Sequence, residues 1–297
     1  LELIVETREG LNARSLRDVK TGRLYADRQY SWPNARLPRL AGRPVVSESP
    51  RGTRSIAFAG RLDGLVITQT FVVSEQDPDA IQEEISIRNA TEEPLFAADF
   101  KCGFAKQLRT GDTWSAEAAL RVCHVPYRRG LGAQLQEWPL REIAEHGMAY
   151  PVGNGVTHQT AAWGAEGWVW TDEAAALLIS KYNARGMEWS LLEPESRERE
   201  TLVRFGGAGL WRPGLPLRPR DASPPECRAG LPDAAARLAP GQSYTFGPTR
   251  LQALEGGWKP AYYAFRKYTE SLGCRPAPDY NPRSEEHTSE LQSLAYL

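Results

Sequence analysis

Apolar and polar side chains alternate with a period of two through much of the first hundred positions. Residues 65–73 form an uninterrupted β-branched and aromatic stretch, and isoleucines at 81, 85 and 87 alternate with polar residues. A turn-forming cluster at 89–94 separates them from another apolar stretch at 95–100. Because successive strand side chains point to opposite faces, this pattern predicts an antiparallel meander with one buried and one wet face.

The same pattern continues along the chain. Gly22 suits the turn of a hairpin over 19–25, because glycine accepts a positive φ angle. Further strands are expected at 1–5, 118–125, 160–171, 174–182, 187–192, 201–205 and 243–254. The glycine-rich stretch 206–209 is expected to be a tight bend, and 213–225 an irregular loop. Many strands and few helices predict a mainly β fold, a two-layer antiparallel sandwich.

Two segments have helical features. A short helix is expected over 138–147, between Pro139 and Gly147. A longer one is expected over about 259–272, and its apolar face consists of Trp258, Ala261, Phe265, Tyr268 and Leu272. Three prolines follow it at 276, 278 and 282, which indicates a semi-rigid connector.

Residues 283–297 resemble the in-frame translation of a sequencing adapter, so we expect them to be an artefact tail. The chain is then a fragment of bacterial, metagenomic origin, cut after Pro282 and lacking an initiator methionine at Leu1. The tail carries one arginine and three glutamates, so without it the net charge changes from −1 to +1. Near-neutrality argues against nucleic-acid or anionic-membrane partners. No apolar run reaches the roughly 18 residues of a membrane helix, and we expect a cytoplasmic location, with export left open.

Common catalytic motifs are absent from the sequence, including phosphate-binding glycine loops and the nucleophile turn of hydrolases. Outside the tail, His124, His146 and His158 have no metal-binding spacing, so we expect no zinc site. Carboxylates are abundant, but sequence spacing does not say which of them meet, so no catalytic residue is assigned. The cysteines lie far apart, at positions 102, 123, 227 and 274, and are expected to be free thiols.

Five tryptophans lie between 163 and 211. Indole faces can stack on sugar rings. Trp168 and Trp170, however, are two apart and share one face of a strand, which favours a core between two sheets. Trp32 lies in a loop-like stretch, where an indole is available to a ligand.

The segment 240–282 carries a family resemblance. It contains Pro-Gly-Gln at 240–242, Glu-Gly-Gly-Trp at 255–258, the expected helix, and Tyr-Asn-Pro at 280–282. It resembles the junction between the N-terminal β-supersandwich, a galactose-mutarotase-like fold, and the catalytic (β/α)8 barrel of bacterial α-galactosidase-like glycoside hydrolases, clan D, of the raffinose-cleaving type. The resemblance implies a supersandwich at 1–255, a helix and linker at 256–282 leading to a missing barrel, and the artefact tail at 283–297.

This resemblance implies a retaining glycoside hydrolase whose two catalytic aspartates lie beyond Pro282, and it implies no metal or organic cofactor. The fragment is then a non-catalytic N-terminal domain, inactive alone, and its parent takes α-galactosides and could form a homo-oligomer. By analogy, Trp32 and Trp211 are candidates for substrate-binding pocket walls. The barrel would cover a face that includes Tyr262, Phe265 and Tyr268, so we expect these side chains to be exposed here and to promote self-association.

Two other classes of function stay open. The first is a stand-alone carbohydrate-binding or structural β-sandwich module. The second is an enzyme acting on the sandwich itself, as mutarotases of similar fold do. A mutarotase needs a positioned histidine base beside the sugar. None of the three histidines lies in a recognisable mutarotase motif, which disfavours the second alternative.

Overall fold

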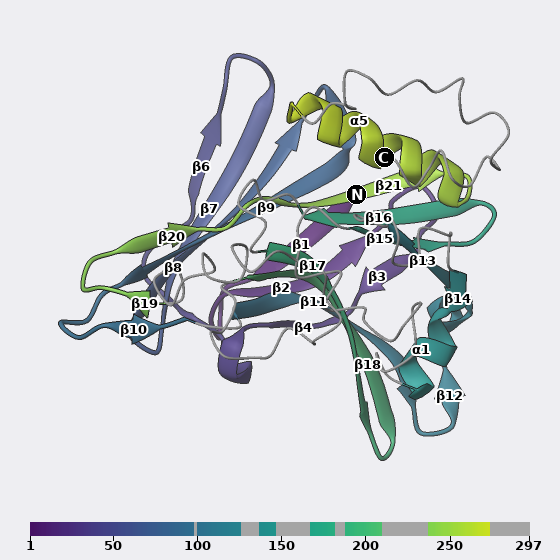
Figure 1. Cartoon of the computed structure of the whole chain (residues 1–297), viewed down its shortest axis with the longest axis horizontal. Coiled ribbons are helices and arrows are strands. Elements are labelled where there is room, and N and C mark those ends of the chain that lie inside the picture. The colour runs from purple at the N-terminus through teal and green to yellow at the C-terminus, as the bar shows by residue number, and fades with distance from the viewer. Residues whose placement is uncertain (98–99, 126–136, 147–166, 182–187, 210–236, 274–297) are drawn as a thin grey trace, which may run out of the picture.

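The computed structural model describes residues 1–97, 100–125, 137–146, 167–181, 188–209 and 237–273 (Figure 1). Its strands are β1 (Glu2–Glu6), β2 (Asn12–Arg17), β3 (Leu24–Ala26), β4 (Arg28–Ser31), β5 (Arg39–Leu40), β6 (Val45–Glu48), β7 (Thr53–Leu62), β8 (Leu65–Ser74), β9 (Asp77–Asn89), β10 (Leu95–Phe96), β11 (Phe100–Thr110), β12 (Thr113–Trp114), β13 (Arg121–Val125), β14 (Glu137–Pro139), β15 (Gly167–Thr171), β16 (Ala175–Lys181), β17 (Glu188–Arg197), β18 (Glu200–Gly209), β19 (Arg237–Leu238), β20 (Ser243–Thr245) and β21 (Thr249–Glu255). The helices are η1 (Pro33–Ala35), η2 (Ala116–Ala119), α1 (Leu140–His146) and α5 (Trp258–Ser271).

Two large antiparallel sheets face each other. The larger has the order β14-β13-β15-β16-β21-β9-β8-β7-β5, with β20 paired to β9 and β6 paired to β7. The second has the order β12-β11-β18-β17, with β4 paired to β11. Smaller sheets, β1-β2-β3 and β10-β19, complete the described strands. The predicted mainly β, two-layer antiparallel sandwich is confirmed.

Aromatic side chains fill the space between the two large sheets. Trp170 of β15 packs against Phe205 of β18, with ring centroids 4.7 Å apart, and Phe205 stacks on Phe104 of β11 at 5.5 Å. Trp168 and Trp170 are both buried in this core, while Val169 between them belongs to a second apolar cluster. The two-residue period therefore places both indoles inward, as the sequence predicts.

Helix α5 covers the opposite face of the larger sheet (Figure 1). Tyr262 and Phe265 pack there with Val169 and Leu178, which explains why β15 and β16 are apolar on both faces. The expectation that Tyr262, Phe265 and Tyr268 are exposed is wrong, because all three are buried against the sheet. The neighbouring Tyr263 is the exposed aromatic residue of this helix, with 60% of its surface accessible.

Several local predictions are confirmed. The hairpin at 19–25 joins β2 to β3, and Gly22 has φ +73°. Strands β8 and β9 contain the predicted segments 65–73 and 81–87, and α5 matches the predicted long helix. The short helix is confirmed in part, because 137–139 pairs as strand β14 before α1 begins. Cys102 and Cys123 are free thiols, whereas Cys227 and Cys274 lie outside the described residues.

The expected bend at 206–209 is wrong. These residues lie inside β18 and pair with both β11 and β17. Gly206 has φ +155° and lies opposite Gly103, where a Cβ atom would meet the Cys102 carbonyl oxygen at 2.6 Å. Glycine is therefore needed for the close approach of two strand backbones. The predicted loop at 213–225 and the segment 160–166 lie outside the described residues.

None of the helices in the described part of the chain is long and apolar enough to cross a lipid bilayer.

Candidate functional site

The two predicted substrate-binding tryptophans have different outcomes. Trp32 belongs to the core between the sheets, with 2% of its surface accessible. Its indole N–H donates to the Leu11 carbonyl oxygen at 2.9 Å, and its ring packs against Tyr30 with centroids 4.9 Å apart. In this structure Trp32 therefore presents no free indole face, and its role as a pocket wall stays a prediction. Trp211 lies outside the described residues.

A buried carboxyl group lies between the two sheets at Glu83 of β9. The Tyr30 hydroxyl and the Gln69 amide both donate to Glu83 Oε1, at 2.6 and 2.5 Å. Burial raises the pKa of Glu83 above its ordinary value, although these two hydrogen bonds oppose the shift. The side chain is almost inaccessible to solvent, so its geometry suits a structural role between the sheets.

A second buried pair joins Lys181 at the end of β16 to Glu188 at the start of β17. Lys181 Nζ lies 3.0 Å from Glu188 Oε2 and donates to the Gly247 carbonyl oxygen at 2.5 Å. Glu188 also accepts hydrogen bonds from the Gly247 N–H and the Tyr244 hydroxyl, at 2.9 Å each. Gly207 leaves the room that Lys181 occupies, since a Cβ atom there would lie 3.1 Å from Nζ. Glu188 is fully inaccessible, so this pair is also internal.

Charged side chains at the protein surface line a groove beside α5 instead. A groove of about 640 Å³ opens at the N-terminal end of this helix, and we call it the Trp258 groove. It is lined by Arg121, Glu137, Asp172, Glu173, Trp258 and Lys259, together with nearby small residues. The chain reaches the helix through Gly256, whose φ is +84° and whose N–H donates to the Ala174 carbonyl oxygen. The turn between β15 and β16 therefore lies directly against the start of α5.

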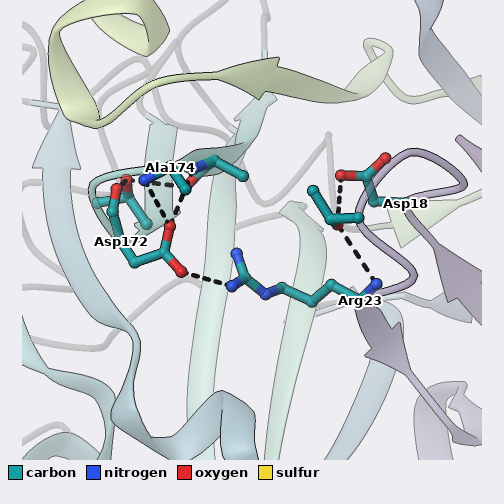
Figure 2. Close-up of polar contacts among 7 residues, drawn as sticks. Asp18, Arg23, Asp172 and Ala174 are labelled. Carbon is teal, nitrogen blue, oxygen red and sulfur yellow. Dashed lines mark hydrogen bonds and ion pairs between the residues drawn. The ribbon is translucent and has the colours of Figure 1, made fainter.

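Asp172 forms one wall of the Trp258 groove and is fixed by three donors (Figure 2). The backbone N–H groups of Ala174 and Ala175 each donate to Asp172 Oδ1 at 2.9 Å, and the Arg23 guanidinium lies 2.5 Å from Oδ2. Burial opposes ionisation of this carboxyl, but the backbone donors and Arg23 outweigh it, so the pKa of Asp172 lies below its ordinary value.

Arg23 is in turn held by the N-terminal hairpin that carries it. Asp18 accepts a hydrogen bond from the Thr21 hydroxyl at 2.6 Å, and Thr21 accepts one from the Arg23 N–H (Figure 2). Asp18 also accepts a hydrogen bond from the Lys20 N–H at 3.0 Å. Lys20 at the tip lies 3.3 Å from Glu255, the last residue of β21. The hairpin is therefore docked beside the Asp172 turn by charged contacts.

The lining of the Trp258 groove contains a second ion pair. Arg121 Nε lies 2.5 Å from Glu137 Oε1, across the antiparallel pair β13-β14. Arg121 and Lys259 supply two positive charges to the lining, against three negative charges from Glu137, Asp172 and Glu173. The lining is thus close to neutral and offers both hydrogen-bond donors and acceptors.

A second groove, of about 810 Å³, runs along the other side of α5 and is called the Arg250 groove. The Arg250 guanidinium is paired with Asp77, donates to Gln252 Oε1 at 3.1 Å, and lies 4.8 Å from the Tyr268 ring centroid. These contacts bind Arg250 to its own neighbours, so the strongest donor of this groove is already engaged.

Neither the two grooves nor the burial of Glu83 and Glu188 was predicted from the sequence. A signal existed for Glu83, because it lies between Ile81 and Ile85 on the inward face of β9. Nothing local marks Asp172, whose partner Arg23 comes from the distant N-terminal hairpin. His124 lies in β13 opposite Trp168 and His146 ends α1, but their side chains, like all of His158, lie outside the described residues.

Comparisons with known proteins give matches at the level of structure. No family model matches the sequence, and no curated protein does. The chain is similar to the GH36 α-galactosidase AgaB from Geobacillus stearothermophilus, with 15% identity and a TM-score of 0.39 over 84% of this chain and 31% of that one. It is similar to the galactosidase domain of the α-galactosidase–sucrose kinase AgaSK, with 13% identity and a TM-score of 0.40 over 89% and 37%.

A shorter protein is matched as well. The galactose mutarotase related enzyme from Lactobacillus acidophilus has 9% identity and a TM-score of 0.39, over 84% of this chain and 93% of that one. The chain spans about a third of the length of the two α-galactosidase structures that it matches.

Proposed function

We propose that this chain is the non-catalytic N-terminal β-supersandwich domain of an α-galactosidase-like glycoside hydrolase. In this proposal residues 1–255 form the domain and residues 256–282 lead into a catalytic barrel. The observation that carries it is the structure of the segment with the family resemblance. Strand β21 ends at Glu255, Gly256 turns the chain, and α5 then packs on the outer face of the same sheet.

The two buried carboxyl groups support a structural rather than catalytic domain. A retaining glycosidase holds two carboxyl groups about 5–5.5 Å apart beside the bond that it cleaves. Glu83 and Glu188 are instead enclosed between the sheets and bonded to internal partners. We therefore assign catalysis to the downstream barrel, with an α-galactoside as substrate of the complete enzyme. A cytoplasmic location and a homo-oligomeric parent belong to the same proposal.

The test is to recover the source gene beyond codon 282 and to express the extended protein beside this chain. We expect the extended protein to hydrolyse 4-nitrophenyl α-galactoside and this chain to show no turnover. Substituting either of two barrel aspartates with asparagine should abolish the activity. A stop codon directly after Pro282 would overturn the proposal, as would turnover by this chain that Glu→Gln substitution within 1–282 removes.

A second candidate is a stand-alone carbohydrate-binding module. The Trp258 groove favours it, because a half-buried indole lies there beside carboxylates at the protein surface. The gene sequence separates the two candidates. A stand-alone module requires that no barrel follow, and it requires carbohydrate binding by this chain alone.

A further inference from the structure

The Trp258 groove is an open groove, lined mostly by charged and polar residues, whose volume is that of a small-molecule site. Its volume of about 640 Å³ falls within the roughly 300–1,000 Å³ that is typical of ligand pockets. From its lining we propose that this groove binds a neutral carbohydrate, one or two sugar rings in size. The inference does not depend on the proposed enzyme, because the groove is built entirely from residues of this chain.

The aromatic part of the site is Trp258. Its indole ring is half-buried, and it packs edge-on against Tyr262, with ring centroids 5.4 Å apart. Tyr262, also a residue of α5, is buried between the helix and the larger sheet, so the indole is held by a fixed neighbour. Lys259 Nζ lies over the same ring, 5.7 Å from its centroid. An immobilised indole is a surface on which the C–H face of a sugar ring can stack, with the Lys259 cation at its border, without a large loss of side-chain entropy on binding.

The polar part consists of two carboxylates with fixed positions. Asp172 is held by Arg23 and by two backbone N–H groups, and Glu137 is held by Arg121. A carboxylate has about four acceptor positions, so each can accept further hydrogen bonds from sugar hydroxyls. Helix α5 begins at the same place, and its N-cap, Gly257, provides no side-chain cap. The backbone N–H groups of Trp258 and Lys259, the first two residues of α5, add donors to these acceptors, whereas Pro260 after them has no N–H.

The charge balance selects among ligand classes. An anion such as phosphate would meet the helix N-terminus and Lys259, but also Glu137, Asp172 and Glu173. An amine would meet the carboxylates, but also Arg121 and Lys259. A polyhydroxyl ligand both donates and accepts hydrogen bonds and brings no charge that must be neutralised. The lining therefore favours a neutral sugar over either class of ion.

The experiment is isothermal titration of the 297-residue chain with methyl α-galactoside, methyl β-glucoside and raffinose, and with inorganic phosphate as the ionic probe. Two variants test the site. Trp258→Leu keeps an apolar side chain over the sheet but removes the aromatic face, and Glu137→Gln keeps the bulk of the carboxylate but removes its charge. Trp114→Leu is the matched control, because Trp114 is also half-buried and lies under an arginine, 4.7 Å from Arg141, but in β12.

We expect at least one glycoside to bind and phosphate not to bind. Each site variant should weaken glycoside binding by about tenfold, which corresponds to about 1.4 kcal/mol, while Trp114→Leu leaves it unchanged. Circular dichroism of each variant confirms that it is folded. Absence of glycoside binding by the unaltered chain overturns the inference, as does equal binding by the Glu137→Gln variant or a preference for phosphate. These results are separate from the hydrolase assay, which needs the barrel.

Discussion

Arg23 and Asp172 form an ion pair, with Nη2 2.5 Å from Oδ2, that joins the N-terminal hairpin to the turn between β15 and β16 (Figure 2). The two residues are 149 positions apart in the chain. The Arg23 side chain is 21% exposed and that of Asp172 is 39% exposed, so the pair lies at the border of the surface. This contact connects the hairpin of the three-stranded sheet β1-β2-β3 to the lining of the Trp258 groove.

We predict that Asp172→Asn lowers the free energy of unfolding by about 1 kcal/mol at neutral pH, a value kept small because the carboxylate is partly exposed to solvent. The asparagine oxygen can still accept from the Ala174 and Ala175 N–H groups. Its amide nitrogen takes the place of Oδ2, so the change removes both the charge and the acceptor of the Arg23 hydrogen bond. Glu48→Gln is the matched control, because Glu48 pairs with Arg54 at 3.2 Å but both side chains are more than half exposed. Urea denaturation of both variants should show a measurable loss for Asp172→Asn alone.

The effect of Asp172 should depend on pH in one direction. The folded-state pKa of Asp172 is depressed, so its stabilising contribution is complete above the ordinary aspartate pKa. That contribution is lost as the pH falls through the folded-state pKa. Stability curves of the unaltered chain and of Asp172→Asn should therefore converge in acid. A gap that stays constant down to the lowest pH at which the protein is folded contradicts this account.

Glu83 should show the opposite pH dependence. Its folded-state pKa is raised by burial, so the folded protein holds this proton more tightly and loses stability as the pH rises from the ordinary glutamate pKa through the folded-state value. Tyr30 and Gln69 both donate to the same oxygen, Oε1, so the amide oxygen of glutamine can accept both bonds. We expect Glu83→Gln to gain stability relative to the unaltered chain as the pH rises.

Glu83→Leu is the control for the hydrogen bonds. Leucine leaves the Tyr30 hydroxyl and the Gln69 amide without their acceptor, at a cost of about 1–3 kcal/mol for each buried donor. Thermal denaturation at neutral pH should rank Glu83→Gln well above Glu83→Leu. Equal stability of the two variants would mean that Glu83 does not organise this part of the core.

Removing only one partner of the Lys181–Glu188 pair should lower the free energy of unfolding strongly. We predict that Lys181→Met lowers the free energy of unfolding by about 3–5 kcal/mol, because it leaves the Glu188 charge buried without its cation. The double variant Lys181→Met/Glu188→Gln should regain part of this loss, since the neutral amide oxygen can still accept from the Gly247 N–H. Chemical denaturation of the single and double variants measures the difference, and a double variant no more stable than the single one would refute the argument.

Local periodicity predicts much of the fold but little of the chemistry. The two-residue period places Trp168 and Trp170 on the same, inward face of β15. This alternation depends only on residues that are neighbours in the sequence. It does not predict that Gly206 faces Gly103, because that pairing joins strands about a hundred residues apart. Trp32 has a loop-like sequence context, yet a carbonyl oxygen from Leu11 and the ring of Tyr30 enclose it.

The candidate site was beyond prediction from the sequence for the same reason. Arg23, Glu137, Asp172 and Trp258 come from four separate segments, and their meeting depends on how the hairpin, two strand pairs and α5 are stacked. The Glu-Gly-Gly-Trp stretch at 255–258 could be recognised as a junction. The turn between β15 and β16, which lies far from this stretch in sequence, bonds to Gly256 and so brings the Trp258 indole beside Asp172. No local pattern predicts that contact.

The two described cysteines should be unreactive while the protein is folded. Burial raises the pKa of the Cys102 thiol to about 12 and that of Cys123 to about 12, so neither forms an appreciable amount of thiolate near neutral pH. Cys102 lies between the sheets, and Cys123 lies in the apolar cluster under α5. Iodoacetamide acts on the thiolate, so both burial and the raised pKa slow the reaction.

Peptide mass spectrometry after brief iodoacetamide treatment should find Cys102 and Cys123 unmodified in the native protein and fully modified in urea. The two sites also report separately on the two cores. Phe265→Ala removes a ring from the cluster under α5 and should increase labelling of Cys123 before that of Cys102. Rapid native labelling of Cys102 in the unaltered chain would show that the core between the sheets is open to solvent, contrary to this structure.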